Sequence, residues 1–248
     1  MGIIRHRSLF ISTLYCFFFT SWILAQKTVT FHSKDGLNVT ADLYIIEENA
    51  PYIVLAHLSQ HSRGEYKNTA AKFNAVGFNC LAVDTRTGNE ALGVVNETAQ
   101  EAKKLGLPTD FLSSEQDIVA SIDYVYELNN NDPILLLGSS FSASLALKIG
   151  ASNPKVKAVM AFSPGEYFGN KLNLKSEVSG FSKPLFVASS KKEAPDVTDL
   201  IDHLSSDIKV QFIPDGEGAH GSIALWDYND NHVEYWTALI DFLAPFKP

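Results

Sequence analysis

Apolar segments alternate with amphipathic segments along most of the chain. Short continuous apolar runs, typical of strands buried in a parallel sheet, occur at 51–57, 78–83, 133–137, 156–162, 184–188 and 208–213. Segments with apolar residues at helical spacing occur at 65–75, 114–128, 141–150, 195–204 and 233–242. Two runs of alternating pattern, 27–32 and 37–46, are joined by a Lys-Asp-Gly turn. This order predicts an α/β fold: a mostly parallel sheet covered by helices, with an antiparallel hairpin at its N-terminal end.

The first 25 residues differ from the rest. Arg5 and Arg7 precede an uncharged apolar run that ends at Ala25, and the polar pair Gln26-Lys27 follows. This pattern is typical of a secretory signal peptide cleaved after Ala25. An uncleaved N-terminal anchor is the alternative, because the run approaches the ~20 residues that span a membrane. We therefore expect an exported protein, either periplasmic or secreted, or one anchored by this segment.

Residues 26–248 are expected to form one domain, since α/β folds of this length are commonly single and no repeat or linker interrupts the pattern. About twenty residues separate Phe162 from Pro184, too few for a large lid domain. The formal net charge is −8, and no basic run suggests binding to nucleic acid. Contact with a membrane is expected only through the N-terminal segment if it stays uncleaved.

The cysteines and histidines give no pattern for a metal or another cofactor. Of the two cysteines, Cys16 lies in the leader and Cys80 lies in the apolar run 78–83, where it is expected to be a small buried hydrophobe. No CxxC or HExxH spacing is present. We therefore expect no metal site and no cofactor.

The strongest chemical signal is Gly138-Ser139-Ser140-Phe141-Ser142, between an apolar run and a helical run. A serine on a strained strand-to-helix turn needs small residues two positions before and after it, as Gly138 and Ser142 are for Ser140. Ser139 would have Leu137 at the first of these positions, and Ser142 should already lie inside the helix. We therefore expect Ser140 to be a nucleophile, with a plain serine-rich loop as the alternative.

A serine hydroxyl needs a base, and the loop after the last predicted strand supplies His220 between Ala219 and Gly221. An acid that orients this imidazole should follow an earlier strand. Glu193 is the first acid after 184–188, with Asp196 and Glu166 as alternatives. A glutamate that only complements a helix dipole is the plain structural explanation of Glu193.

The order Ser140, Glu193, His220 is that of the α/β-hydrolases. The chain resembles the dienelactone-hydrolase-like branch of that superfamily, and the resemblance rests on the segments 34–37, 55–57, 62–66, 81–86, 138–144 and 219–222. It implies a three-layer α/β-hydrolase sandwich in which the N–H groups of Phe141 and Leu58 bind an oxyanion. The founding members of the branch have a cysteine nucleophile, and related chains often have His-Gln where this chain has His57-Leu58.

Together these features predict an exported serine hydrolase that cleaves a small ester, thioester or lactone through an acyl-enzyme on Ser140. The partner would be a small-molecule acyl substrate. The alternative is an exported, non-catalytic protein of the same fold that binds a small ligand or a protein partner. The presence of Leu58 in place of the usual glutamine, together with a displaced acid, favours that alternative.

The leader makes a first prediction. Expressed in a host that exports it, the mature protein should begin at Gln26, because the polarity changes abruptly after Ala25. N-terminal sequencing of the purified protein measures this directly. A full-length species in the membrane fraction would instead identify residues 1–25 as an anchor.

Overall fold

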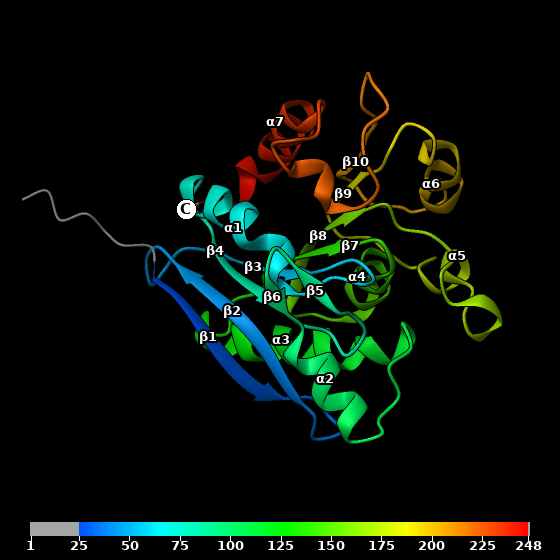
Figure 1. Cartoon of the computed structure of the whole chain (residues 1–248). Helices are drawn as coiled ribbons and strands as arrows, with labels where there is room; N and C mark the ends of the chain where they lie inside the picture. The colour runs from blue at the N-terminus through cyan, green and yellow to red at the C-terminus, as the bar shows by residue number, and fades with distance from the viewer. Residues whose placement is uncertain (1–24, 248) are drawn as a thin grey trace, which may run out of the picture.

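The computed structural model describes residues 25–247, and its centre is a mixed sheet of eight strands (Figure 1). The strands are β1 (Ala25–His32), β2 (Asn38–Ile45), β3 (Tyr52–Ala56), β4 (Asn79–Val83), β7 (Ile134–Ser139), β8 (Val156–Phe162), β9 (Leu185–Ala188) and β10 (Lys209–Phe212). They lie in the order β1-β2-β4-β3-β7-β8-β9-β10. Strand β2 is antiparallel to both of its neighbours, and every other neighbouring pair is parallel. The predicted sheet and N-terminal hairpin are confirmed.

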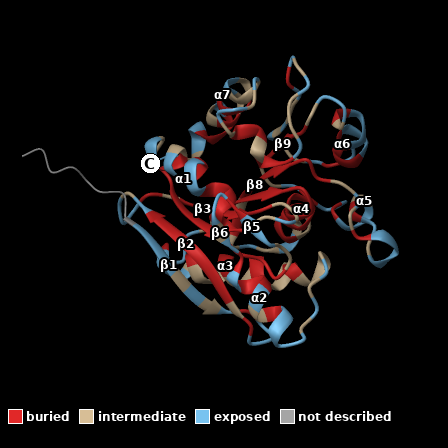
Figure 2. Cartoon of the chain, viewed as in Figure 1, coloured by how far each residue is buried: buried red, intermediate tan, exposed pale blue. Residues whose placement is uncertain are grey.

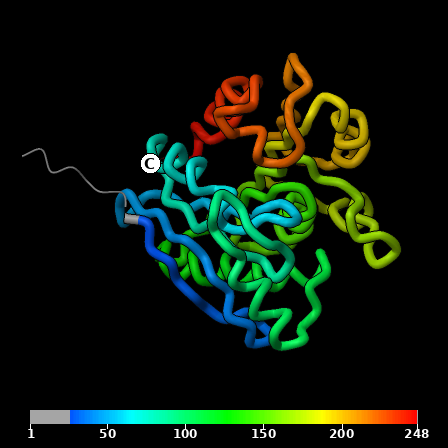
Figure 3. Tube along the Cα trace, in the orientation of Figure 1, coloured from blue at the N-terminus to red at the C-terminus, as the bar shows by residue number. Residues whose placement is uncertain are grey.

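Helices cover both faces of this sheet. They are α1 (Lys67–Ala75), α2 (Glu97–Lys104), α3 (Glu115–Leu128), α4 (Phe141–Ser152), α5 (Leu174–Glu177), α6 (Ala194–Ile201) and α7 (His232–Leu243). Short 3₁₀ helices are η1 (Arg63–Tyr66), η2 (Leu112–Ser114), η3 (Gly169–Lys171), η4 (Ser222–Leu225) and η5 (Ala244–Phe246). In Figure 3 the chain runs from the blue β1–β2 edge to the yellow and orange segments at the opposite edge.

Two hydrophobic cores lie on the two faces, because successive side chains of a strand point to opposite sides. Along β3, Ile53 and Leu55 belong to the core that includes α1 and α7, whereas Val54 and Ala56 belong to the core that includes α3, α4 and α6. The central strands are accordingly buried at every position (Figure 2). This double burial explains why their sequences are continuously apolar, and it produces the predicted three-layer sandwich.

Two elements between β4 and α3 lay outside the predicted pattern: helix α2 and a hairpin of β5 (Glu90–Ala91) and β6 (Val94–Val95). The strands of the hairpin have two residues each, too few to show a period. Its position depends on close packing against η1, where a Cβ on Gly64 would lie 2.1 Å from the carbonyl oxygen of Ala91. The helix expected at 65–75 is preceded by η1, which extends it back to Arg63.

The segment between β8 and β9 contains only η3 and α5, so no large lid is inserted there. Cys80 is fully buried, and burial raises the pKa of its thiol well above the usual value. No helix within residues 25–247 is long and apolar enough to span a membrane. The leader prediction lies outside the described residues, apart from Ala25, whose backbone begins β1 opposite Ile45.

A buried arginine joins the loop after β4 to α3. The Arg86 guanidinium is fully buried and donates to both carboxylate oxygens of Asp117, at 2.7–3.2 Å. It also contacts Asp35 in the turn between β1 and β2, with Nη1 2.7 Å from Oδ2. The Asp117 carboxylate accepts a further hydrogen bond from the Arg86 backbone N–H. Removing one partner of such a pair leaves an uncompensated buried charge.

Replacing Asp117 should therefore destabilise the fold strongly. We expect Asp117→Ala to lower the free energy of unfolding by about 3–5 kcal/mol in urea denaturation. Asp123→Ala removes the partner of Lys155 from a half-exposed pair and should cost less than about 1 kcal/mol. Equal losses in the two variants would contradict the role assigned to the Arg86 cluster.

Candidate active site

The backbone of Ser140 occupies a strained turn between β7 and α4. Its φ is +58° and its ψ is −124°, a conformation that side-chain-bearing residues rarely adopt and that costs on the order of 1–3 kcal/mol. The turn is too tight for a side chain at position 138, because a Cβ there would lie 2.2 Å from the carbonyl oxygen of Ser142. The Ser140 N–H is held by the carbonyl of Phe162, at 2.8 Å. The strained residue of the turn is therefore Ser140, as the spacing of the small residues in the sequence predicts.

Residues from three loops form one chain of hydrogen bonds at the carboxyl edge of the sheet, after β7, β9 and β10 (Figure 1). His220 Nε2 lies 2.9 Å from Ser140 Oγ, and His220 Nδ1 lies 2.5 Å from Glu193 Oε1. Of the three acids that the sequence offered to orient His220, Glu193 is the one whose carboxylate contacts the imidazole. Glu166 instead accepts the N–H groups of Leu174 and Lys175 at the start of α5, and Asp196 lies in the first turn of α6.

The second oxygen of Glu193 is held by two serines. It accepts the Ser163 hydroxyl at 2.9 Å, and the N–H and hydroxyl of Ser190 at 3.0 and 2.7 Å. Burial tends to raise the pKa of Glu193, but the hydrogen bonds from His220, Ser190 and Ser163 outweigh it and lower the pKa to about 2. The carboxylate is therefore ionised at neutral pH.

The ionised Glu193 acts in turn on His220. The hydrogen bond between them raises the pKa of His220, while burial of the ring opposes that shift. The charges of Glu193 and Glu65 raise it further. Glu193 thus stabilises the imidazolium and holds Nδ1, which leaves Nε2 directed at the Ser140 hydroxyl.

The two expected oxyanion donors differ in this structure. Phe141 is the first residue of α4, so its N–H has no acceptor within the helix. The Leu58 N–H, in contrast, donates to Glu65 Oε2 at 2.9 Å. The Leu58 N–H, predicted as the second oxyanion donor, is therefore already engaged in this conformation, because a buried carboxylate accepts that hydrogen.

Sequence reasoning also missed residues that support the site. Ser163, directly after β8, has a φ of +54°; its hydroxyl donates to Glu193 and accepts the Gly221 N–H at 2.9 Å. The Tyr167 hydroxyl donates to the Ser163 carbonyl at 3.0 Å. Burial raises the pKa of Tyr167, and the nearby Ser140 hydroxyl opposes this shift. Ser163 and Tyr167 follow the end of the parallel strand β8, and this position could have identified them from the sequence, as it did for Ser140 and His220.

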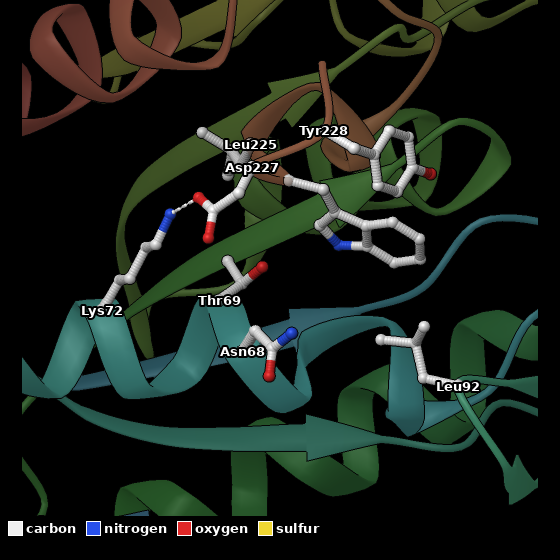
Figure 4. Close-up of a pocket in the computed structure, with 8 residues that line it drawn as sticks. Asn68, Thr69, Lys72, Leu92, Leu225, Asp227 and Tyr228 are labelled. Carbon is white, nitrogen blue, oxygen red and sulfur yellow. Dashed lines mark hydrogen bonds and ion pairs between the residues drawn. The ribbon is translucent and has the colours of Figure 1, made fainter.

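Two hollows lie near these residues. A cavity of about 430 Å³ is lined by Glu193 and Tyr167 together with residues of α5 and α6. A second, of about 230 Å³, lies between α1 and the segment after η4, and its lining includes Leu92, Tyr228 and the Lys72–Asp227 ion pair (Figure 4). Of Ser140, His220 and Glu193, the first cavity is lined by Glu193 alone, and the second by none of the three.

No family model matches the chain, and no curated protein matches it either. Solved structures do. A dienelactone hydrolase from Anabaena variabilis superimposes with a TM-score of 0.68 at 15% identity, over 90% of this chain and 99% of that one. An esterase from Pyrococcus furiosus gives 0.69 at 14% identity, over 91% and 92%. An α/β hydrolase from a Penicillium species gives 0.68 at 14% identity, over 90% and 99%.

These likenesses show that the chain has the α/β-hydrolase fold, with structural neighbours that include a dienelactone hydrolase. They extend over nearly the whole length of each protein. At such low identity the comparison concerns the fold, and the chemistry has to be argued from the side chains.

The contact between Glu193 and His220 makes a prediction in solution. Glu193→Gln should lower the pKa of His220, measured by NMR titration of the ring protons, because the hydrogen bond that the imidazole donates to an ionised acid is what raises it. Glu166→Gln serves as the matched control and should leave that pKa unchanged, since Glu166 caps α5 instead. An unchanged titration in Glu193→Gln would show that the two side chains are apart in solution.

Proposed function

We propose that this protein is a serine hydrolase that cleaves a small ester, thioester or lactone through an acyl-enzyme on Ser140. The observation that carries the proposal is the continuous hydrogen-bonded chain from Ser140 through His220 to Glu193, with Ser140 on a strained turn. Structural neighbours described as a dienelactone hydrolase and as esterases support hydrolysis as the reaction class. Export through the N-terminal leader is part of the same proposal.

In the acylation step, Ser140 Oγ attacks the carbonyl carbon of the substrate and its proton passes to His220 Nε2. The carbonyl π electrons move onto oxygen and form a tetrahedral oxyanion. When this intermediate collapses, the bond to the leaving group breaks and His220 returns the proton to the departing oxygen or sulfur. The ionised Glu193 stabilises the imidazolium throughout, which is why its low pKa supports the proposal.

Water completes the cycle by the same route. His220 takes a proton from water as the water oxygen attacks the acyl carbon and forms a second oxyanion. When this oxyanion collapses, the bond between the acyl carbon and Ser140 Oγ breaks, His220 returns the proton to Oγ, and the acid is released. The Phe141 N–H, at the positive end of the α4 dipole, would bind both oxyanions. One such donor contributes about 2.7–4 kcal/mol to the stability of a transition state. The proposal requires no metal or other cofactor.

A non-catalytic role in binding a small ligand or a protein partner is the second candidate. It is favoured by one observation, the engagement of the Leu58 N–H with Glu65, which leaves the resting site without its second oxyanion donor. The two candidates differ in a single measurable property, the reactivity of Ser140.

Reaction with a fluorophosphonate tests the proposal. Serine attack on phosphorus expels fluoride and leaves a stable adduct, so we expect one adduct, located at Ser140 by mass spectrometry. Ser140→Ala should abolish labelling, whereas Ser139→Ala should retain it, because the Ser139 hydroxyl accepts the Ser222 N–H and it is the Ser140 hydroxyl that lies at His220 Nε2. A folded wild-type protein that is not labelled would favour the binding role, and an adduct on Ser139 or Ser142 would contradict the assigned register.

A further inference from the structure

A second carboxylate, Glu65, lies beside the candidate site without belonging to the Ser140–His220–Glu193 chain. Glu65 is fully buried in η1. Its Oε2 accepts the Leu58 N–H at 2.9 Å and lies 3.0 Å from His61 Nδ1, and its Oε1 accepts the Ser222 hydroxyl at 2.5 Å. Its carboxylate therefore joins the loop after β3 to the loop that carries His220, two residues before Ser222.

These hydrogen bonds keep Glu65 charged. Burial alone would raise its pKa, but the hydrogen bonds from His61 and Ser222 outweigh burial and lower it. A carboxylate that accepts several hydrogen bonds is stable as an anion even without solvent. A permanent negative charge thus lies against the backbone donor that an oxyanion would need.

The peptide unit between His57 and Leu58 is held at both ends. Its carbonyl accepts the Ser142 hydroxyl at 2.7 Å, and its N–H donates to Glu65. Because one peptide plane carries both groups, these two contacts define its orientation. Leu58 also packs against the loop that carries His220, because a Cβ placed on Gly221 would lie 3.2 Å from Leu58 Cδ2.

From this arrangement we propose that Glu65 is a positioning residue that holds the Leu58 N–H in the resting site and releases it to the oxyanion. The role rests on the proposed function. One N–H proton serves one strong acceptor, so the carboxylate and the oxyanion compete for it. The Leu58 N–H can therefore serve as the second oxyanion donor only when its hydrogen bond to Glu65 is broken. Full stabilisation of the oxyanion then requires a rotation of the peptide between His57 and Leu58.

Glu65→Gln separates this role from simple support of the fold. The substituted glutamine side chain would have the same shape, and its amide oxygen can accept from Leu58 and His61. Its NH₂ group can donate to Ser222 Oγ, while the Ser222 hydroxyl turns to Tyr66, whose oxygen lies at 3.1 Å. The hydrogen-bond network stays complete, so the variant is expected to fold, and only the charge of the acceptor changes.

The first measurement is the second-order rate of phosphonylation by a fluorophosphonate. Glu65→Gln should react about fivefold faster than wild type, the size expected when a neutral acceptor replaces a charged one. Asp117→Asn also removes a buried carboxylate charge, but at Arg86 and away from the loop, and should react at the wild-type rate. An equal or slower rate in Glu65→Gln, with labelling of wild type intact, overturns the role of Glu65 alone.

The second measurement observes the Leu58 N–H directly, by NMR of protein labelled with ¹⁵N-leucine, with Leu58→Ile to assign the resonance. Glu65→Gln should shift the Leu58 amide proton upfield, and phosphonylation of Ser140 should shift it in wild type. A Leu58 resonance that is unaffected by Glu65→Gln, or by the adduct, overturns the proposal. Absence of any adduct on wild type would overturn the proposed function itself, and with it the release step.

Discussion

The turn at Ser140 is the constraint on which the site depends. At the end of β7 the chain reverses into α4 so sharply that residue 138 has no room for a Cβ and residue 140 adopts a positive φ. The surrounding sheet and helices, buried on both faces, make this strained backbone tolerable. In return the turn places the Ser140 hydroxyl 2.9 Å from His220 Nε2, at the N-terminal end of α4.

The loops around this turn are joined by serine hydroxyls that bind carboxylates. Ser163 and Ser190 hold Glu193, and Ser222 holds Glu65. Hydrogen bonds to a charged group are stronger than those between neutral groups, so a few short side chains hold the loops against each other. The two carboxylates differ in effect: Glu193 stabilises a positive charge on His220, whereas Glu65 competes for a donor that an oxyanion needs.

Local patterns in the sequence determined much of this architecture. Continuous apolar runs identify the central strands because both faces of the sheet are buried, and the small residues at 138 and 142 identify Ser140 because the turn allows nothing larger. Glu193 could be ranked first among three acids because it is the first acid after β9 (Leu185–Ala188). The short hairpin at Glu90–Val95 was missed, because two-residue strands have no period and are positioned by packing against Gly64.

Contacts between distant segments were decided only by the tertiary structure. Glu65 and Ser222 are 157 positions apart, and no periodicity relates them. Whether the Leu58 N–H is free or bonded depends on Glu65 of η1, which accepts its hydrogen. Glu65 is placed there by packing of η1 against the segment that follows His220, where Trp226 Nε1 donates to the Glu65 carbonyl. The sequence alone thus determined the central strands, the turn at residue 140 and the candidate serine and histidine, since these follow from burial and local sterics. The partner of each polar group was set by three-dimensional packing, because a hydrogen bond needs its donor and acceptor within about 3 Å.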